Sequence, residues 1–148
     1  MRFNSKILLC VLVLGLAGCA TKQPATSSFV FRIPTADAPP VVQAITEFVT
    51  AHCPPGQSTL VLDPAPTDKQ ANTIASEVSD ALREKGFAVA ADAKAAPDAH
   101  HVRYLVTPLF DGFLVRVSVD HAEGSRLFLH DKAGTLVASG ALAVRSEE

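Results

Sequence analysis

Residues 101–120, HVRYLVTPLF-DG-FLVRVSVD, constrain the fold more than any other part of the chain. Apolar and polar side chains alternate on both sides of Asp111-Gly112, which is typical of strands with one buried face. An Asp-Gly pair between two such segments predicts a hairpin with a two-residue type I′ turn. This turn would align three apolar pairs on one face of the sheet: Phe110 with Phe113, Val106 with Val117, and Tyr104 with Val119.

Two amphipathic segments ahead of the hairpin predict helices. The first begins at Pro39 or Pro40 and runs to about residue 52, with apolar residues at helical spacing. The second begins at a capping box formed by Thr67 and Gln70. It ends at Gly86, because glycine suits the left-handed backbone position that follows a helix.

Short apolar segments account for the rest of the domain. After the hairpin, a loose turn leads to a strand in which Leu127 and Leu129 would continue the core face. Gly140 would mark a bulge in the last strand. We therefore predict an α+β domain with two helices packed on one face of a largely antiparallel sheet that ends in a four-stranded meander. The strands outside the hairpin are expected at 58–63, 87–91, 125–130 and 135–145.

The first 18 residues have the layout of a secretory signal. Arg2 and Lys6 precede the run ILLCVLVLGL, which is apolar over ten residues and is followed by small residues. A helix needs about 20 apolar residues to span a bilayer, so this run is too short to remain as a membrane span. We interpret residues 1–18 as a signal peptide that does not belong to the fold.

Cys19 ends the sequence LAGC, which resembles the lipobox of bacterial lipoproteins. Its thiol would take a diacylglyceryl group, and the small residues Ala17 and Gly18 would let a peptidase reach the bond before it. Ala20 is not the Asp that often marks retention in the inner membrane, so the resemblance favours the outer membrane. We predict a lipid-anchored protein that faces the periplasm; the alternative is an ordinary cleavage site with a coincidental cysteine.

Residues 19–38 are rich in Pro, Ser, Thr and Ala and predict a periplasmic linker, which leaves 39–148 as a single domain. Five β-prone residues interrupt this linker between two prolines. They fit an edge strand of the protein's own sheet, a strand added to a partner's sheet, or a disordered segment. The possible partner-binding residues are Phe29, Val30, Phe31, Arg32 and Ile33.

Charge and composition argue against nucleic-acid binding. Without residues 1–18, the chain has 11 basic and 15 acidic side chains, a formal net charge of −4. No block of basic residues stands out, and the chain has one Tyr and no Trp on which bases can stack.

The sequence contains no assembled catalytic or metal-binding motif, so we predict a protein that is not an enzyme and has no cofactor or metal. His100 and His101 are adjacent and would point to opposite sides of a strand, which prevents them from sharing a metal. The aspartates fall at predicted turns, where local hydrogen bonds favour them. Cys53 is expected to be half-buried at a helix end, with an intermolecular disulfide or a reactive thiol as alternatives.

Several short motifs follow one another between the second predicted helix and the end of the chain. They are Gly86-Phe87 after the second helix, Val115-Arg116-Val117, SRLF at 125–128, and GTLVASGA at 134–141. With the lipobox and the chain length, these motifs resemble the TrbH family of conjugal transfer lipoproteins. Leu142 departs from the family pattern, which has an aromatic residue after the Gly-Ala pair.

This resemblance implies a structural part of a type IV secretion apparatus that exports DNA during plasmid conjugation. The lipoprotein would anchor the outer-membrane part of the channel and contact other transfer proteins of the envelope, as one of several copies. It would not bind the DNA itself. The alternative from the residues is a free periplasmic lipoprotein that binds a small apolar ligand or a lipid between its helices and its sheet.

Overall fold

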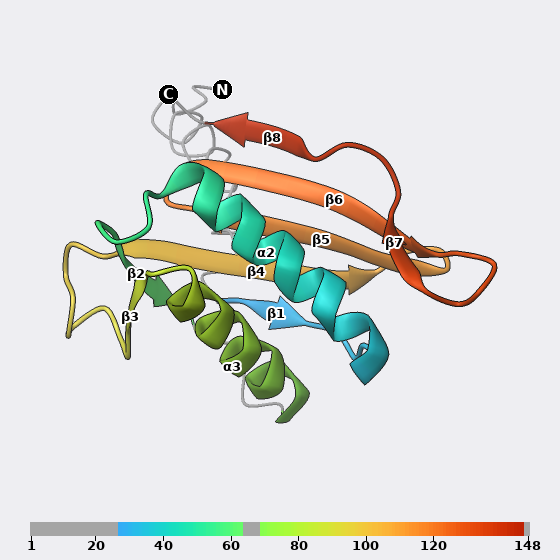
Figure 1. Cartoon of the computed structure of the whole chain (residues 1–148), viewed down its shortest axis with the longest axis horizontal. Helices are drawn as coiled ribbons and strands as arrows, with labels where there is room; N and C mark the ends of the chain where they lie inside the picture. Colours follow the sequence, from blue (N-terminus) through green and yellow to red (C-terminus); the bar gives the residue numbers. More distant parts are fainter. Residues whose placement is uncertain (1–26, 64–68, 147–148) are drawn as a thin grey trace, which may run out of the picture.

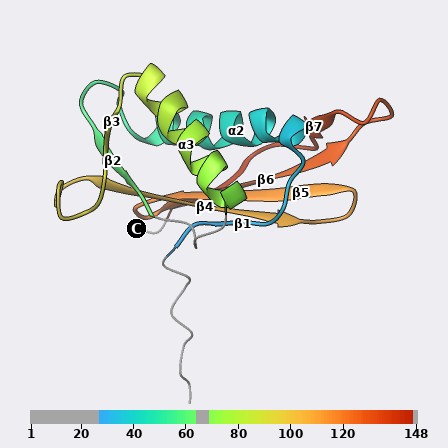
Figure 2. The same ribbon diagram turned by 90° about the horizontal axis from the view of Figure 1, so that it is seen from below.

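The structure is a computed structural model, and it describes residues 27–63 and 69–146 of the chain. Helices α2 and α3 lie over one face of an eight-stranded sheet, and no described helix covers the other face (Figure 1, Figure 2). This arrangement confirms the predicted α+β class. The elements follow the order β1 (Phe29–Val30), η1 (Thr35–Asp37), α2 (Ala38–His52), β2 (Thr59–Leu62), α3 (Lys69–Glu84), β3 (Ala88–Ala90), β4 (His100–Pro108), β5 (Gly112–Val119), β6 (Ala122–His130), β7 (Leu136–Ala138) and β8 (Ala143–Ser146).

The centre of the sheet consists of the long antiparallel strands β4, β5 and β6. The main path through the sheet is β3-β2-β4-β5-β6-β7, and the β4–β7 part is the predicted meander. β2 and β1 both run parallel to β4 and share its outer edge. The predicted last strand is divided at Gly140 into β7 and β8, which both pair with β6. Gly140 has a φ of 101°, a conformation in which residues with a Cβ are strained.

The core lies between the helices and the face of the sheet that they cover. Each large apolar side chain that is fully buried there contributes about 1.5–3 kcal/mol to stability. These side chains come from both helices and from β2, β4 and β5: Ile45, Phe48, Ile74, Val78, Leu82, Leu60, Val102, Tyr104, Val106 and Val115.

Helix α3 ends as the sequence predicts. Gly86 has a φ of 93°, and its N–H donates to the carbonyl of Arg83 at 2.9 Å. The N–H of Phe87 donates to the carbonyl of Leu82 at 3.1 Å, which completes a Schellman motif. Phe87 is buried against the core. Thr67, the predicted N-cap at the start of this helix, lies outside the described residues, so the capping box remains a prediction.

The predicted hairpin is present, but its register is wrong by two residues. Pro108 pairs with Phe113, and the N–H of Leu109 donates to the carbonyl of Gly112 at 3.0 Å, so the loop covers residues 109–111. Phe110 is therefore not in the core but at the tip of the loop, with a φ of 55° and 85% of its surface exposed. The aligned apolar pairs are Val102 with Val119, Tyr104 with Val117, and Val106 with Val115.

The reason for the shift is the packing of Gly112. A Cβ at this position would collide with the carbonyl of Phe128 and lie 2.8 Å from Cα of Leu129. Gly112 is a glycine because two backbones approach closely there, and it pairs with Leu129 within the sheet instead of forming the turn.

Strand β6 also differs from the prediction. The turn before β6 is predicted to be loose, but it has two residues, because Val119 already pairs with Ala122. Phe128 faces the helices and is 4% exposed, so Leu127 and Leu129 lie on the opposite face and not in the core. Gly124 fixes this orientation, because the ring of Phe48 on α2 occupies the place where its side chain would be.

Replacing Gly124 with alanine should destabilise the domain. The new Cβ would lie 2.6 Å from Cδ2 of Phe48, so the helix must shift, at a cost of about 1–3 kcal/mol. Urea denaturation measures the free energy of unfolding, and Ser125→Ala on the other face is the matched control. Equal stability of the two variants would show that Phe48 does not pack on Gly124.

Candidate functional site

The predicted lipidation residue, Cys19, lies outside the described residues, which begin at Ser27. Modification of this cysteine remains a prediction. No helix in residues 27–63 or 69–146 is long and apolar enough to cross a membrane. Among the predicted site residues, the structure describes Phe29–Ile33.

The segment Phe29–Ile33 enters the protein's own sheet at β1. Phe29 lies opposite Leu105 of β4, and the N–H of Phe31 donates to the carbonyl of Val106 at 2.9 Å. Just before β1, the buried Ser28 accepts a hydrogen bond at its Oγ from the N–H of Tyr104, at 3.2 Å. The segment is thus fixed to β4 by bonds on both sides of β1.

The side chains of this segment alternate between the core and solvent. Val30 and Ile33 are 6% and 3% exposed and belong to the core, whereas Phe29 and Phe31 are 43% and 47% exposed. The predicted linker, residues 19–38, therefore includes residues that pack with the domain from β1 onward. The two phenylalanines remain available for contact with another surface.

These phenylalanines belong to a larger apolar surface that the sequence reasoning missed. We call the helix-free side of the sheet the open face; it points away from α2 and α3 (Figure 2). Leu127 lies opposite Leu114 on this face, and Val137 lies opposite Leu129. The apolar residues of the open face are Phe29, Phe31, Leu105, Leu114, Leu127, Leu129 and Val137.

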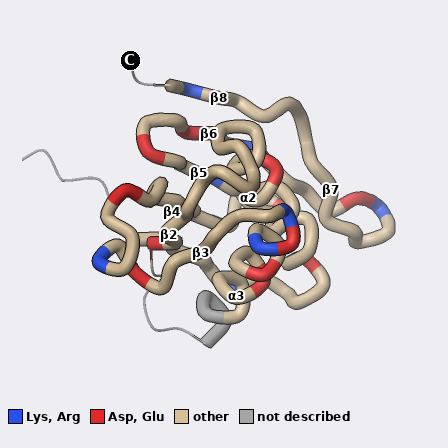
Figure 3. Tube along the Cα trace, turned by 60° about the vertical axis from the view of Figure 1, so that its left-hand side comes forward, with Lys and Arg blue, Asp and Glu red and all other residues tan. Residues whose placement is uncertain are grey.

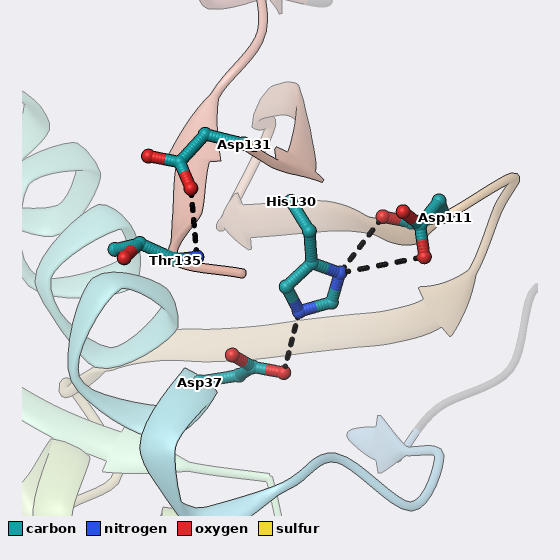
Figure 4. Close-up of polar contacts among 5 residues, drawn as sticks. All are labelled: Asp37, Asp111, His130, Asp131 and Thr135. Carbon is teal, nitrogen blue, oxygen red and sulfur yellow. Dashed lines mark hydrogen bonds and ion pairs between the residues drawn. The ribbon is translucent and has the colours of Figure 1, made fainter. Parts of the chain in front are cut away.

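His130 joins three distant parts of the chain (Figure 4). Its Nε2 lies 3.1 Å from Oδ2 of the buried Asp37 at the start of α2. Its Nδ1 lies 2.9 Å from the carbonyl oxygen of Asp111 in the β4–β5 loop. Both nitrogens face acceptors, and only the protonated ring can donate from both. The hydrogen bond to Asp37, followed by the bond to the Asp111 backbone, raises the pKa of His130.

Two other histidines contact aspartates at the N-terminal end of β4. Nδ1 of His100 lies 2.7 Å from Oδ2 of Asp120, and Nδ1 of His101 lies 3.1 Å from Oδ1 of Asp63. The adjacent histidines thus have different partners, as their alternation on a strand predicts. Burial raises the pKa of Asp120, but hydrogen bonds from the His100 ring and the His101 amide outweigh it and leave this pKa below its usual value.

Asp92 and Asp131 hold their own turns. Oδ1 of Asp92 accepts bonds from the N–H groups of Lys94 and Ala95, each at 2.9 Å. Oδ1 of Asp131 accepts a bond from the N–H of Thr135 at 2.9 Å, which closes the β6–β7 turn. In the part of the chain that the structure describes, no three His, Cys, Asp or Glu side chains converge as metal ligands.

Cys53 caps the C-terminus of α2 and is buried, at 3% exposure, not half-buried as expected. Burial, with a smaller contribution from the charge of Asp120, raises the pKa of its thiol. The thiolate is the reactive form of cysteine, so both the burial and the raised pKa disfavour a reactive thiol or an intermolecular disulfide.

Replacing His130 with glutamine should reduce stability more in acid than in alkali. Because the folded-state pKa of His130 is raised above its ordinary 6.5, its stabilising effect is complete below that pH and is lost as the pH rises through the folded-state pKa. Free energies of unfolding of both proteins, at about pH 5.5 and about pH 8.5, measure the effect. His121→Gln is the control, because His121 is exposed at the β5–β6 turn. A loss for His130→Gln that is independent of pH would contradict the assignment.

Comparison with known proteins gives one family. The model of the conjugal transfer protein TrbH family matches residues 20–148, which include every described element. No curated protein and no solved structure gives a significant match. The match also covers the GF, SRLF and Gly-Ala motifs of the sequence. The chain therefore belongs to the TrbH family of conjugal transfer proteins.

Proposed function

We propose that this protein is a lipid-anchored structural component of the envelope channel through which conjugative plasmids export DNA. Its membership in the TrbH family, over residues 20–148, is the observation that carries this proposal. Conjugal transfer moves DNA across the cell envelope, and a secretory signal would bring the protein there. Its partners would be other transfer proteins of the envelope.

The anchor that we propose is a lipid on Cys19. The sequence LAGC supports it, because small residues precede a cysteine that directly follows an apolar signal run. Two acyl chains give a stable attachment to a membrane without a spanning helix. Ala20 in place of aspartate supports the outer membrane as the site of anchoring.

A structural role suits the polar side chains that the structure describes. Three histidines each contact an aspartate from a different segment of the fold, so these contacts join separate segments: His130, His100 and His101. Large side chains, including Phe48 and Tyr104, fill the space between the helices and the sheet, which argues against the alternative of an apolar ligand held there.

Replacing Cys19 with alanine should release the protein from the membrane. Without acyl chains to bury, the variant should fractionate with soluble periplasmic proteins, and plasmid transfer should fall by roughly tenfold or more. Mass spectrometry of the mature N-terminus, cell fractionation and mating frequency are the measurements. Cys10→Ala is the matched control, since Cys10 lies within the apolar run and should affect none of them.

The readouts separate the parts of the proposal. An unmodified Cys19 in the wild-type protein would disprove lipid anchoring. Normal transfer by a strain that lacks the whole gene would disprove the role in conjugation.

A further inference from the structure

Most of the exposed large apolar side chains of the described residues lie on the open face or in the loop between β4 and β5. Phe29 and Phe31 lie at its β1 edge, and Phe110 projects from the β4–β5 loop with 85% of its surface exposed. Large apolar side chains left exposed in this number on one side of a domain mark a contact site with a protein or a membrane. Unlike the opposite face, the open face has no described helix over it (Figure 1).

Arginines occupy the part of the open face next to this apolar surface. Arg116 of β5 is exposed and lies opposite Leu105, and Arg103 of β4 lies opposite Ser118. Arg145 of β8 lies on the same face, where it pairs with Glu123 at 3.4 Å. Three arginines thus share this face. The helices are acidic by comparison: α2 and the second half of α3 carry Glu47, Glu77, Asp80 and Glu84 and, among Lys and Arg, Arg83 alone (Figure 3).

The length of the chain ahead of β1 limits where the domain can lie. Phe29 lies ten positions after Cys19, and a fully extended chain over ten residue steps spans at most about 36 Å. Strand β4, with nine residues, is about 30 Å long. A lipid on Cys19 would therefore keep the β1 edge of the open face within about 36 Å of the membrane, a distance similar to the length of β4.

We propose that the open face and the Phe110 loop bind the surface of the membrane that holds the anchor. This inference rests on the proposed lipidation of Cys19. Phe29, Phe31 and Phe110 enter the boundary between headgroups and acyl chains, and Arg116 and Arg103 contact anionic lipid phosphates. Apolar and aromatic side chains beside arginines are the combination that holds proteins at this boundary.

A second copy of the chain fits the open face less well than a lipid surface does. A symmetric dimer through this face would place the same patch of both chains in contact. The arginines near the centre of one face would then lie against those of its partner, which is unfavourable. Lipid phosphates provide the opposite charge without this conflict.

Single tryptophans test the proposal, because the chain contains no Trp. The full-length lipidated protein would carry either Phe110→Trp or, as the matched control, Gln43→Trp on the exposed side of α2. Both would be reconstituted in vesicles of phosphatidylethanolamine and phosphatidylglycerol, with and without brominated acyl chains. Brominated lipid should quench the tryptophan at residue 110 by about twofold or more, because it lies at the acyl boundary, and leave that at residue 43 unchanged.

Two results would overturn the proposal: equal quenching of both tryptophans, or no quenching of either. Protection of the tryptophan at residue 110 that depends on protein concentration, not on lipid, would assign the face to a second copy instead.

Arg116→Glu should weaken binding to phosphatidylglycerol vesicles more than Glu77→Gln, and equal binding of these two variants would contradict the role of the arginines.

The test also separates this inference from the proposed function. Where mass spectrometry finds Cys19 unmodified, lipid anchoring fails, but the same protein added to preformed vesicles still reports on the open face. Quenching at residue 110 would then support surface binding without an anchor. Its absence in a protein with a modified Cys19 would overturn this inference alone.

Discussion

The contact between the ring of Phe48 and Gly124 determines how closely α2 approaches β6. Because Gly124 has no side chain, α2 comes close enough to β6 for Phe48 to be 1% exposed. This contact also fixes which side chains of β6 face the helices, so Phe128 is in the core and its neighbours are not. Leu127 and Leu129 therefore lie on the open face, opposite Leu114 and Val137.

The alternation of residues 101–120 was sufficient to predict the hairpin and its two faces, and the Gly86 signal was sufficient to predict the end of α3. The register was beyond reach, because a slip of two residues leaves the same side chains on the same face. Only the packing of Gly112 against β6 decides between the two registers. At residues 127–129 the sequence is apolar throughout, so either orientation fits the pattern until Phe48 is placed.

The candidate site was predictable where local pattern governs it. The β-prone residues Phe29–Ile33 predict an edge strand among other possibilities, and β1 has that place in the sheet. The bond between His130 and Asp37 joins residues 93 positions apart, which no local pattern reveals. The predicted register places Phe110 opposite Phe113 on the core face, whereas the loop that holds Phe110 presents it to solvent.

The parallel pairing of β1 with β4 has a mechanical consequence. A pull on the chain ahead of Ser28, directed along β1, would load the bonds to Tyr104 and Val106 in shear, so that they resist together and do not open one at a time. Any force that reaches the domain through the chain ahead of β1 would thus pass into the long central strands of the sheet before it reaches the helices. β1 therefore makes the start of the domain resistant to a pull along the chain.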